Sequence, residues 1–168
     1  MIKISSVLGG IFLLALSMGC NVEPPKIGVV DVVKVTNDSI EGKKANAELQ
    51  ALVNAKRAMV KDKAEAIDKL KKNLEKEPDS NRKAKEGELK SANAEYKKFV
   101  AAADAEVQKK AAELKNKLLG QIKKVLETIG QEEKFLLIHT NENAPYFNKN
   151  IDISDKVINK YNELEGGK

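Results

Sequence analysis

Glu77-Pro78-Asp79-Ser80-Asn81 lies in the middle of a long region that is rich in Lys, Glu and Ala and holds no other proline. Proline cannot continue a helix, and Asp, Ser and Asn are the residues that most often cap the start of one. Helical periodicity leads up to this stretch from about residue 43 and resumes after it to about residue 129. These five residues therefore predict a tight turn between two long helices, with the tip of the hairpin at 77–82.

Apolar residues recur at steps of three and four on both sides of this turn, which is typical of a coiled-coil seam. In the first predicted helix, 43–77, two lysines share the stripe; its members are Leu49, Leu52, Lys56, Met59, Lys63, Ala66, Leu70 and Leu74. In the second, 81–129, they are Leu89, Ala92, Tyr96, Phe99, Ala103, Val107, Ala111, Leu114, Leu118, Ile122, Val125 and Ile129. At 1.5 Å per residue the two arms are roughly 50 and 70 Å long.

Two β-favouring runs flank the hairpin and predict strands, at Ile27–Val33 and at Phe135–His139. A loop follows over 141–147, with a short edge strand. The stretch Ile151–Tyr161 then predicts a final helix that Ser154 caps. Its inward face holds Ile153, Val157, Ile158 and Tyr161. The predicted fold class is mainly α with a small β body (α+β), in which a long antiparallel helical hairpin extends from a short-stranded domain.

The charged residues gather on the hairpin. The chain has 168 residues with 30 Lys plus Arg and 25 Asp plus Glu. Between residues 41 and 130 there are 22 basic and 15 acidic residues, a net charge of +7. A cationic tip surrounds Pro78: Lys69, Lys71, Lys72, Lys76, Arg82, Lys83 and Lys85. Only two basic residues are Arg and seven residues are aromatic, so we expect no nucleic-acid partner.

The sequence indicates a non-enzyme without cofactor or metal. His139 is the single histidine and Cys20 the single cysteine, so neither finds a second ligand of its own kind for a metal site. Asp152 and Asp155 have the spacing of capping and turn residues. No Gly-x-Ser-x-Gly motif and no phosphate-binding glycine loop is present.

The first 20 residues are typical of a bacterial export signal. A basic start, the apolar run Val7–Leu16 and small residues before Cys20 favour export over a membrane span. The cysteine resembles that of a lipobox, which predicts a signal peptide at 1–19, a lipid on Cys20 and a tether at 20–26. Ser17 stands where a lipobox prefers Leu. Ordinary cleavage after Ser17, which leaves a free thiol, is the alternative.

The two strand regions, 27–41 and 130–168, form a discontinuous body around the arm 42–129. Two or three strands and one short helix are too little for independent stability, so we expect oligomerisation through this β-rich body. The residues predicted to carry it are Ile27, Val29, Val30, Phe135, Leu136 and Ile138.

This order of parts resembles the Skp/OmpH family of periplasmic chaperones over residues 26–163. The resemblance rests on Lys26–Asp31, Glu41–Ala45 and the closing blocks Phe135–His139 and Ile151–Ile158. It implies a jellyfish-like homotrimer whose helical arms surround a cavity for unfolded outer-membrane proteins, without use of ATP. The predicted lipid distinguishes this chain from the soluble members of the family. A tethered chaperone works near one membrane and cannot shuttle freely, which puts the transport part of the family role in doubt.

Two hypotheses follow for the function. The first is an ATP-independent periplasmic holdase that prevents aggregation of unfolded outer-membrane proteins. The alternative is an envelope-anchored structural coiled-coil lipoprotein, a spacer or adhesin-like rod. The predicted location is the periplasm, anchored to a membrane by Cys20. Asn21 stands where enteric inner-membrane lipoproteins carry Asp, which favours the outer membrane. The cationic tips could also attract anionic headgroups.

Overall fold

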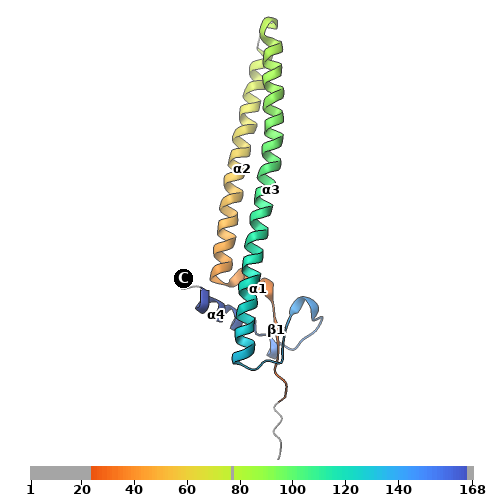
Figure 1. Cartoon of the computed structure of the whole chain (residues 1–168). Helices are drawn as coiled ribbons and strands as arrows, with labels where there is room; N and C mark the ends of the chain where they lie inside the picture. Colours follow the sequence, from red (N-terminus) through yellow and green to blue (C-terminus); the bar gives the residue numbers. More distant parts are fainter. Residues whose placement is uncertain (1–23, 77, 166–168) are drawn as a thin grey trace, which may run out of the picture.

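A long helical hairpin extends from a small body in the computed structural model, which describes residues 24–76 and 78–165 (Figure 1). The predicted signal segment and Cys20 lie outside the described residues. The body is made of strands β1 (Ile27–Val30) and β2 (Leu137–Thr140), helices α1 (Val32–Asp38) and α4 (Ser154–Glu165), and the lower part of the hairpin. The predicted fold class, mainly α with a small sheet, is confirmed.

The hairpin consists of α2 (Ile40–Glu75), with 36 residues, and α3 (Asp79–Glu132), with 54. These lengths correspond to about 54 and 81 Å. Lys76 closes α2, because its N–H donates to the carbonyl of Asn73 at 3.1 Å. Pro78 then precedes the first residue of α3, so Asp79, Ser80 and Asn81 lie inside the helix, and the prediction that they cap its start is wrong. The turn was therefore predicted correctly, and because α3 is longer it continues past the start of α2 into the body (Figure 1).

The predicted seam is confirmed on α3 and partly wrong on α2. Every predicted α3 position is buried or half-buried. On α2, Met59 is 48% exposed and Ala66 is exposed, whereas Ile67 is only 6% exposed. Lys63 is exposed as well. Val60 and Ile67, each one position after a predicted residue, are covered in their place, while Leu70 and Leu74 are half-buried as predicted. The face that packs against α3 decides which of the neighbouring apolar positions is covered.

The sheet has two parallel strands, in which Ile27 pairs with Leu137 and Val30 with Thr140. The prediction that the first strand runs to Val33 is wrong. Asp31 ends it, because its carboxylate accepts a hydrogen bond from the N–H of Lys34 at 2.9 Å and so caps α1. Val32 and Val33 therefore belong to a helix, and the body contains more helix than the expected β-rich one.

The second strand also starts later than predicted. Lys134 has a φ of 56°, and this left-handed residue turns the chain after α3. Phe135 and Leu136 precede β2, which starts at Leu137. The expected edge strand is wrong as well: a 3₁₀ turn, Asn141–Asn143, follows β2, and a second one covers Lys149–Ile151.

A tight corner joins α1 to α2. Ser39 is fully buried, and its hydroxyl accepts a hydrogen bond from the N–H of Gly42 at 3.1 Å. A Cβ on Gly42 would lie 1.6 Å from the carbonyl oxygen of Thr36. Glycine is thus required where the start of α2 crosses α1.

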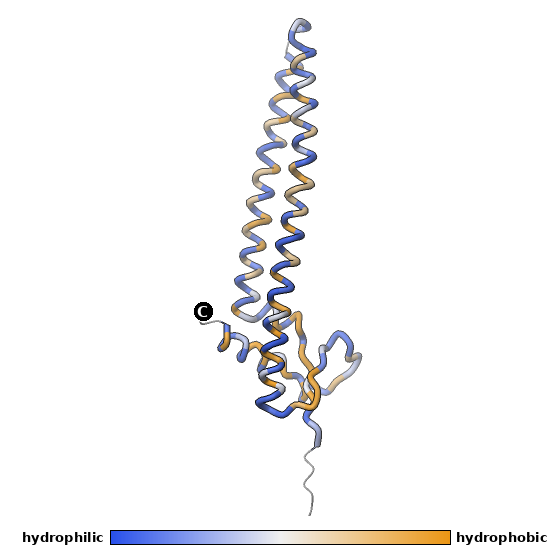
Figure 2. The backbone as a smooth tube through the Cα atoms, viewed as in Figure 1, coloured by the Kyte–Doolittle hydropathy of each residue, from blue (hydrophilic) through white to orange (hydrophobic). Residues whose placement is uncertain are grey.

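One hydrophobic core joins all the body elements. Its buried members are Val30, Val35, Ala45, Leu118, Ile122, Val125, Ile129, Ile153, Val157 and Tyr161. Figure 2 shows the hydrophobic residues gathered around the strands and mixed with polar ones along the arms. Val157 and Tyr161 of α4 are buried as predicted and Ile158 is half-buried, while Ile153 is buried but precedes the helix.

Ser154 has a different role from the predicted one. It is the first residue of α4, not the residue before the helix, and its buried hydroxyl accepts the N–H of Asp31 at 2.8 Å. The serine therefore joins the start of α4 to the start of α1. Asp152 has the turn role that its spacing predicts, because its carboxylate accepts a hydrogen bond from the N–H of Ser154 at 2.9 Å.

Candidate functional surfaces

The arm exposes alanines along one face of each helix. On α2 this face includes Ala51, Ala55, Ala58 and Ala66, beside Met59, and on α3 it includes Ala94, Ala101, Ala105 and Ala112, while the exposed Ala84 and Ala102 lie to one side of it. At 100° per residue, the four alanines of α3 lie within about 20° of one line. These stripes offer small apolar contacts between charged side chains, with no large aromatic ring to hold a partner tightly.

The cationic tip lies on the described part of both helices near the turn. Three of its seven members contact an acidic neighbour on their own helix: Lys71–Asp68 at 3.6 Å, Arg82–Asp79 at 3.4 Å and Lys85–Glu88 at 3.0 Å. Four exposed members make no ion pair with a described residue: Lys69, Lys72, Lys76 and Lys83. Because such pairs are exposed, they are worth little to stability, and the tip keeps its positive field.

Two ion pairs join the helices in the middle of the arm. Lys56 Nζ lies 2.6 Å from Glu106 and Lys110 Nζ lies 2.5 Å from Glu48. The hydrogen bond that Lys110 donates to Glu48 raises the pKa of Lys110. Lys56 was predicted within the seam, and it lies half-buried at the edge of the helix pair. The arm is therefore held partly by charges at its edges, because its apolar seam is thin.

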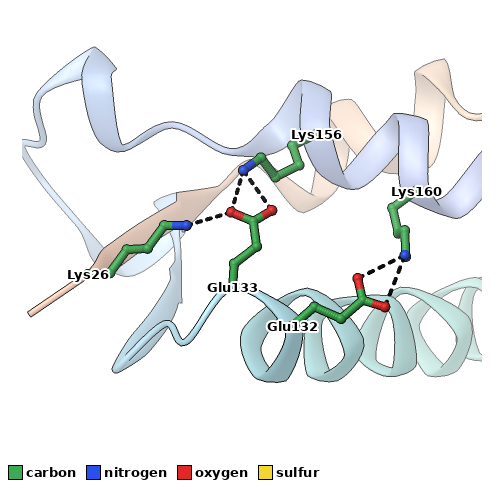
Figure 3. Close-up of polar contacts among 5 residues, drawn as sticks. All are labelled: Lys26, Glu132, Glu133, Lys156 and Lys160. Atoms are coloured by element: carbon green, nitrogen blue, oxygen red, sulfur yellow. Dashed lines mark hydrogen bonds and ion pairs between the residues drawn. The ribbon is translucent and has the colours of Figure 1, made fainter.

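Glu133 joins three segments at the end of α3 (Figure 3). Its carboxylate accepts hydrogen bonds from Lys26, which precedes β1, at 2.5 Å, and from Lys156 of α4 at 2.6 Å. Lys156 and then Lys26 lower the pKa of Glu133. Lys26 also lies 4.2 Å from the centre of the Phe135 ring. We call Lys26, Glu133 and Lys156 the basal cluster.

Further contacts fix α4 to the body. Lys160 lies 2.9 Å from Glu132, and Lys34 of α1 lies 2.6 Å from Asp155. These hydrogen-bonded partners raise the pKa of both lysines. The hydroxyl of Tyr161 donates to Gln121 at 2.9 Å. Burial, together with Glu41 and Glu165, raises the pKa of Tyr161 to about 12.

The six residues predicted for oligomerisation separate into two groups. Val29 and Val30 are buried within the chain, and Phe135 and Ile138 are half-buried. Ile27 is 41% exposed and Leu136 is 73% exposed; Leu137, which sequence reasoning missed, is 49% exposed. β1 has β2 on one side and a bridge from Val29 to Asp152 on the other, whereas no described strand pairs with the outer edge of β2.

A cavity of about 460 Å³ opens between α1, α2 and α3 at the root of the arm. We call it the root groove. Its walls are mainly apolar and include Val32, Val33, Leu49, Leu114, Leu118 and Leu119, and Thr140 and Glu142 line its end near β2. Sequence reasoning missed the groove because it assigned Val32 and Val33 to a strand.

The residues considered for catalysis do not form a cluster. His139 is exposed, and its Nδ1 lies 2.9 Å from the carbonyl oxygen of Thr140. Within 24–76 and 78–165, no group of three or more His, Cys, Asp or Glu side chains could hold a metal ion. The described helices also include none that is long and apolar enough to span a membrane.

Comparisons with protein families and solved structures find proteins that are similar to this chain. A family model described as outer membrane protein (OmpH-like) matches residues 26–161. A crystal structure of an OmpH-like protein from Caulobacter crescentus CB15, provisionally named an outer membrane chaperone, superposes with a TM-score of 0.78 at 15% identity. The match covers 84% of this chain and 86% of that one. No curated protein sequence matches this chain significantly.

Proposed function

This chain belongs to the OmpH-like family, and from that premise we propose that it is an ATP-independent periplasmic holdase for unfolded outer-membrane proteins. The observation that carries the proposal is the arm surface. Exposed alanines, Met59 and lysine stems provide many weak contacts on a thinly packed hairpin. An unfolded barrel protein exposes alternating apolar side chains, which such a surface covers without binding any of them tightly.

Weak and numerous contacts suit capture followed by release. Each exposed alanine contributes little buried area, so the affinity comes from the sum along the arm. The four tip lysines that pair with no described acidic residue attract acidic segments of a client, and this attraction falls with ionic strength over about 8 Å at physiological salt. Capture is therefore fast, and release needs no nucleotide.

We also propose a homotrimer that assembles through the body. The exposed Ile27, Leu136 and Leu137, together with the free edge of β2, support this part of the proposal. A two-stranded sheet with an open edge favours pairing with another chain. Val29 and Val30 pack the sheet against the core of their own chain, and the exposed Ile27, Leu136 and Leu137 contact the neighbouring copies.

A lipid on Cys20 anchors the protein in the proposed arrangement. Residues 24–26 enter the body at the end opposite the arm tips (Figure 1). An anchored body would therefore hold the tips away from the membrane surface and toward arriving clients. Mass spectrometry of the exported protein checks the anchor: an acylated Cys20 is expected, and a mature chain that starts at Met18 would contradict it.

The first test is suppression of aggregation. A urea-denatured outer-membrane barrel protein is diluted into buffer with increasing amounts of this protein, and light scattering is measured. We expect protection that saturates near one trimer per client and weakens with salt. No protection at several-fold excess would contradict the holdase and leave the structural lipoprotein as the better account.

Matched lysine variants separate the tip from general charge. Lys69, Lys72, Lys76 and Lys83 are changed together to Gln; the control changes the exposed Lys97, Lys98, Lys117 and Lys124 to Gln, which removes the same charge elsewhere on the arm. The tip variant should need several-fold more protein for equal protection, with the control within about twofold of wild type. Equal loss in both variants would mean that net charge, not the tip, attracts the client.

A further inference from the structure

The segment between β2 and α4 leaves the body as a protruding loop (Figure 1). Tyr146 in this segment is 85% exposed, the highest value among the large exposed apolar or aromatic side chains of the body. The residues 143–148, Asn-Ala-Pro-Tyr-Phe-Asn, carry no charge in a chain that is 33% charged. A neutral segment with an exposed aromatic ring stands out on a surface that is otherwise rich in charged side chains.

One buried polar atom just before this segment also lacks a hydrogen-bond partner among the described residues. The side-chain oxygen of Asn141 is covered from solvent and accepts no hydrogen bond from the described residues. Buried acceptors of this kind normally have a partner. The segment thus combines an exposed ring with an unused acceptor, as expected for a piece of chain whose final contacts include another molecule.

The root groove has the complementary properties. Its walls are apolar, its volume of about 460 Å³ is ample for one aromatic side chain, and its one end reaches Thr140 and Glu142, next to the free edge of β2. The segment 143–148 of the same chain does not line it. Val33 and Leu119 remain 56% and 39% exposed along its rim.

We infer that Tyr146 of one copy docks into the root groove of a neighbouring copy. This inference rests on the oligomer of the proposed function and adds the contact that fixes its geometry. Client binding fits the groove less well, because the proposed trimer already places a second copy at β2, whose last residue, Thr140, lines the groove.

The arrangement also predicts how the copies are related. A segment and a groove are different surfaces, so each copy gives one contact and receives one, which generates a ring when the rotation closes. A single tyrosine buries roughly 150–250 Å², well below the roughly 1,200 Å² of a specific interface. The β2 edge and the exposed Ile27 and Leu136 must therefore supply the rest of the contact.

Cross-linking between two variants of the full chain tests the contact. Both carry Cys20→Ser; one adds Tyr146→Cys with one affinity tag, and the other adds Leu119→Cys with a second tag. The control partner carries Met59→Cys, which has similar exposure (48% against 39%) on the outer arm. After co-refolding and treatment with a short bismaleimide, we expect the doubly tagged product from Tyr146 with Leu119 and not with Met59. Its absence, or equal yield with Met59, would overturn the docking.

Assembly strength is the second readout, by sedimentation of the full chain over a concentration series. Tyr146→Ala should raise the dissociation constant about tenfold, and Ala111→Phe, which fills the groove, should do the same. Tyr146→Phe keeps the ring and should stay within about threefold of wild type. Circular dichroism shows whether each variant is folded.

The outcomes separate this inference from the proposed function. If Tyr146→Ala assembles as tightly as wild type and still suppresses aggregation, the docking is wrong and the holdase stands. If wild type remains a monomer, both the docking and the trimer are wrong, and the aggregation test alone decides the holdase. A Tyr146→Ala variant that dissociates and loses protection in parallel supports docking and shows that the holdase depends on assembly.

Discussion

Helix α3 runs through two environments, and the difference between them explains how one chain can be both stable and adaptable. In its last fifteen residues, four side chains are buried: Leu118, Ile122, Val125 and Ile129. Over the much longer stretch before them, Ala103 is the one described residue that is buried. The same helical repeat continues throughout, so the difference comes from what packs against it: α1, α4 and the sheet at one end, and α2 alone along the arm.

This contrast teaches that stability is concentrated where several elements meet. A residue at the root of the arm contributes to one core that joins every element of the body, whereas a residue of the outer arm contacts a single neighbouring helix. The outer arm is therefore expected to open locally at lower free energy than the body. A surface that must adjust to many unfolded partners benefits from such looseness.

The largest effect on stability is expected from a matched pair of leucine truncations on α3. Leu118→Ala, at 5% exposure in the body core, should lower the free energy of unfolding by about 3 kcal/mol. Leu89→Ala, half-buried in the outer arm, should cost about 1 kcal/mol, because less contact is lost. Urea denaturation followed by circular dichroism measures both. Equal losses would mean that the arm is as well packed as the body.

A pair of glycine substitutions sharpens the comparison further. Gly42→Ala should destabilise by at least about 2 kcal/mol, because the new Cβ meets the carbonyl of Thr36 and the corner must open. Gly87→Ala has nothing within 4 Å and lies inside α3, so it should stabilise by about 0.5–1 kcal/mol through helix propensity. Thermal melting distinguishes them by sign, and two losses would contradict the open surroundings of Gly87.

A third pair of substitutions tests the corrected seam of α2. Ile67→Ala should cost about 2 kcal/mol, because this side chain is buried between the arm helices. Met59→Ala should cost no more than about 0.5 kcal/mol, since Met59 is 48% exposed. Hydrogen exchange of the α2 amides locates the effect. If Met59→Ala destabilised the arm more than Ile67→Ala, the seven-residue repeat read from the sequence would be the correct seam after all.

The smallest effect is expected from the ion pairs. Glu133→Gln should cost about 1 kcal/mol near neutral pH, since it breaks two contacts of the basal cluster at once. Glu106→Gln, which breaks one exposed pair of the arm, should cost about 0.3 kcal/mol. Urea titration at fixed low ionic strength compares the two variants.

The pH dependence of the same pair follows from the pKa of Glu133. That pKa lies below the ordinary 4.5 in the folded state, so the carboxylate stabilises the fold above pH 4.5. The stabilisation is lost as the pH falls through the folded-state pKa. The difference between wild type and Glu133→Gln should therefore disappear in acid. A difference that persists at about pH 2 would show that packing, not charge, is lost in the variant.

Much of the fold and part of the candidate site could be predicted from residues alone. Pro78 determined the place of the turn, and the long apolar repeat of α3 determined most contact positions of that helix, although it missed Leu126, which packs against the core. The exposed lysines of the tip followed from their number and their distance from any core. These features are local: each depends on the intrinsic behaviour of a few neighbouring residues, or on a period that one straight helix repeats many times.

Other features depended on residues far apart in the sequence. Val32 and Val33 have the side chains of a strand, but the carboxylate of Asp31 caps a helix there, and its own N–H is held by Ser154, 123 positions away. Val60 and Ile67 replace Met59 and Ala66 in the seam because α3 sets which face of α2 is covered. The root groove exists only where α1 crosses the hairpin.

The sequence by itself thus determined the number of long helices, the place of the turn and the distribution of charge, because those are properties of short stretches. The tertiary structure decided where β1 stops, which face of α2 is buried, that the end of β2 borders an apolar groove, and that Glu133 holds three segments together. Each of these depends on which distant partner satisfies a backbone N–H, a carboxylate or an apolar face, and no local pattern contains that choice.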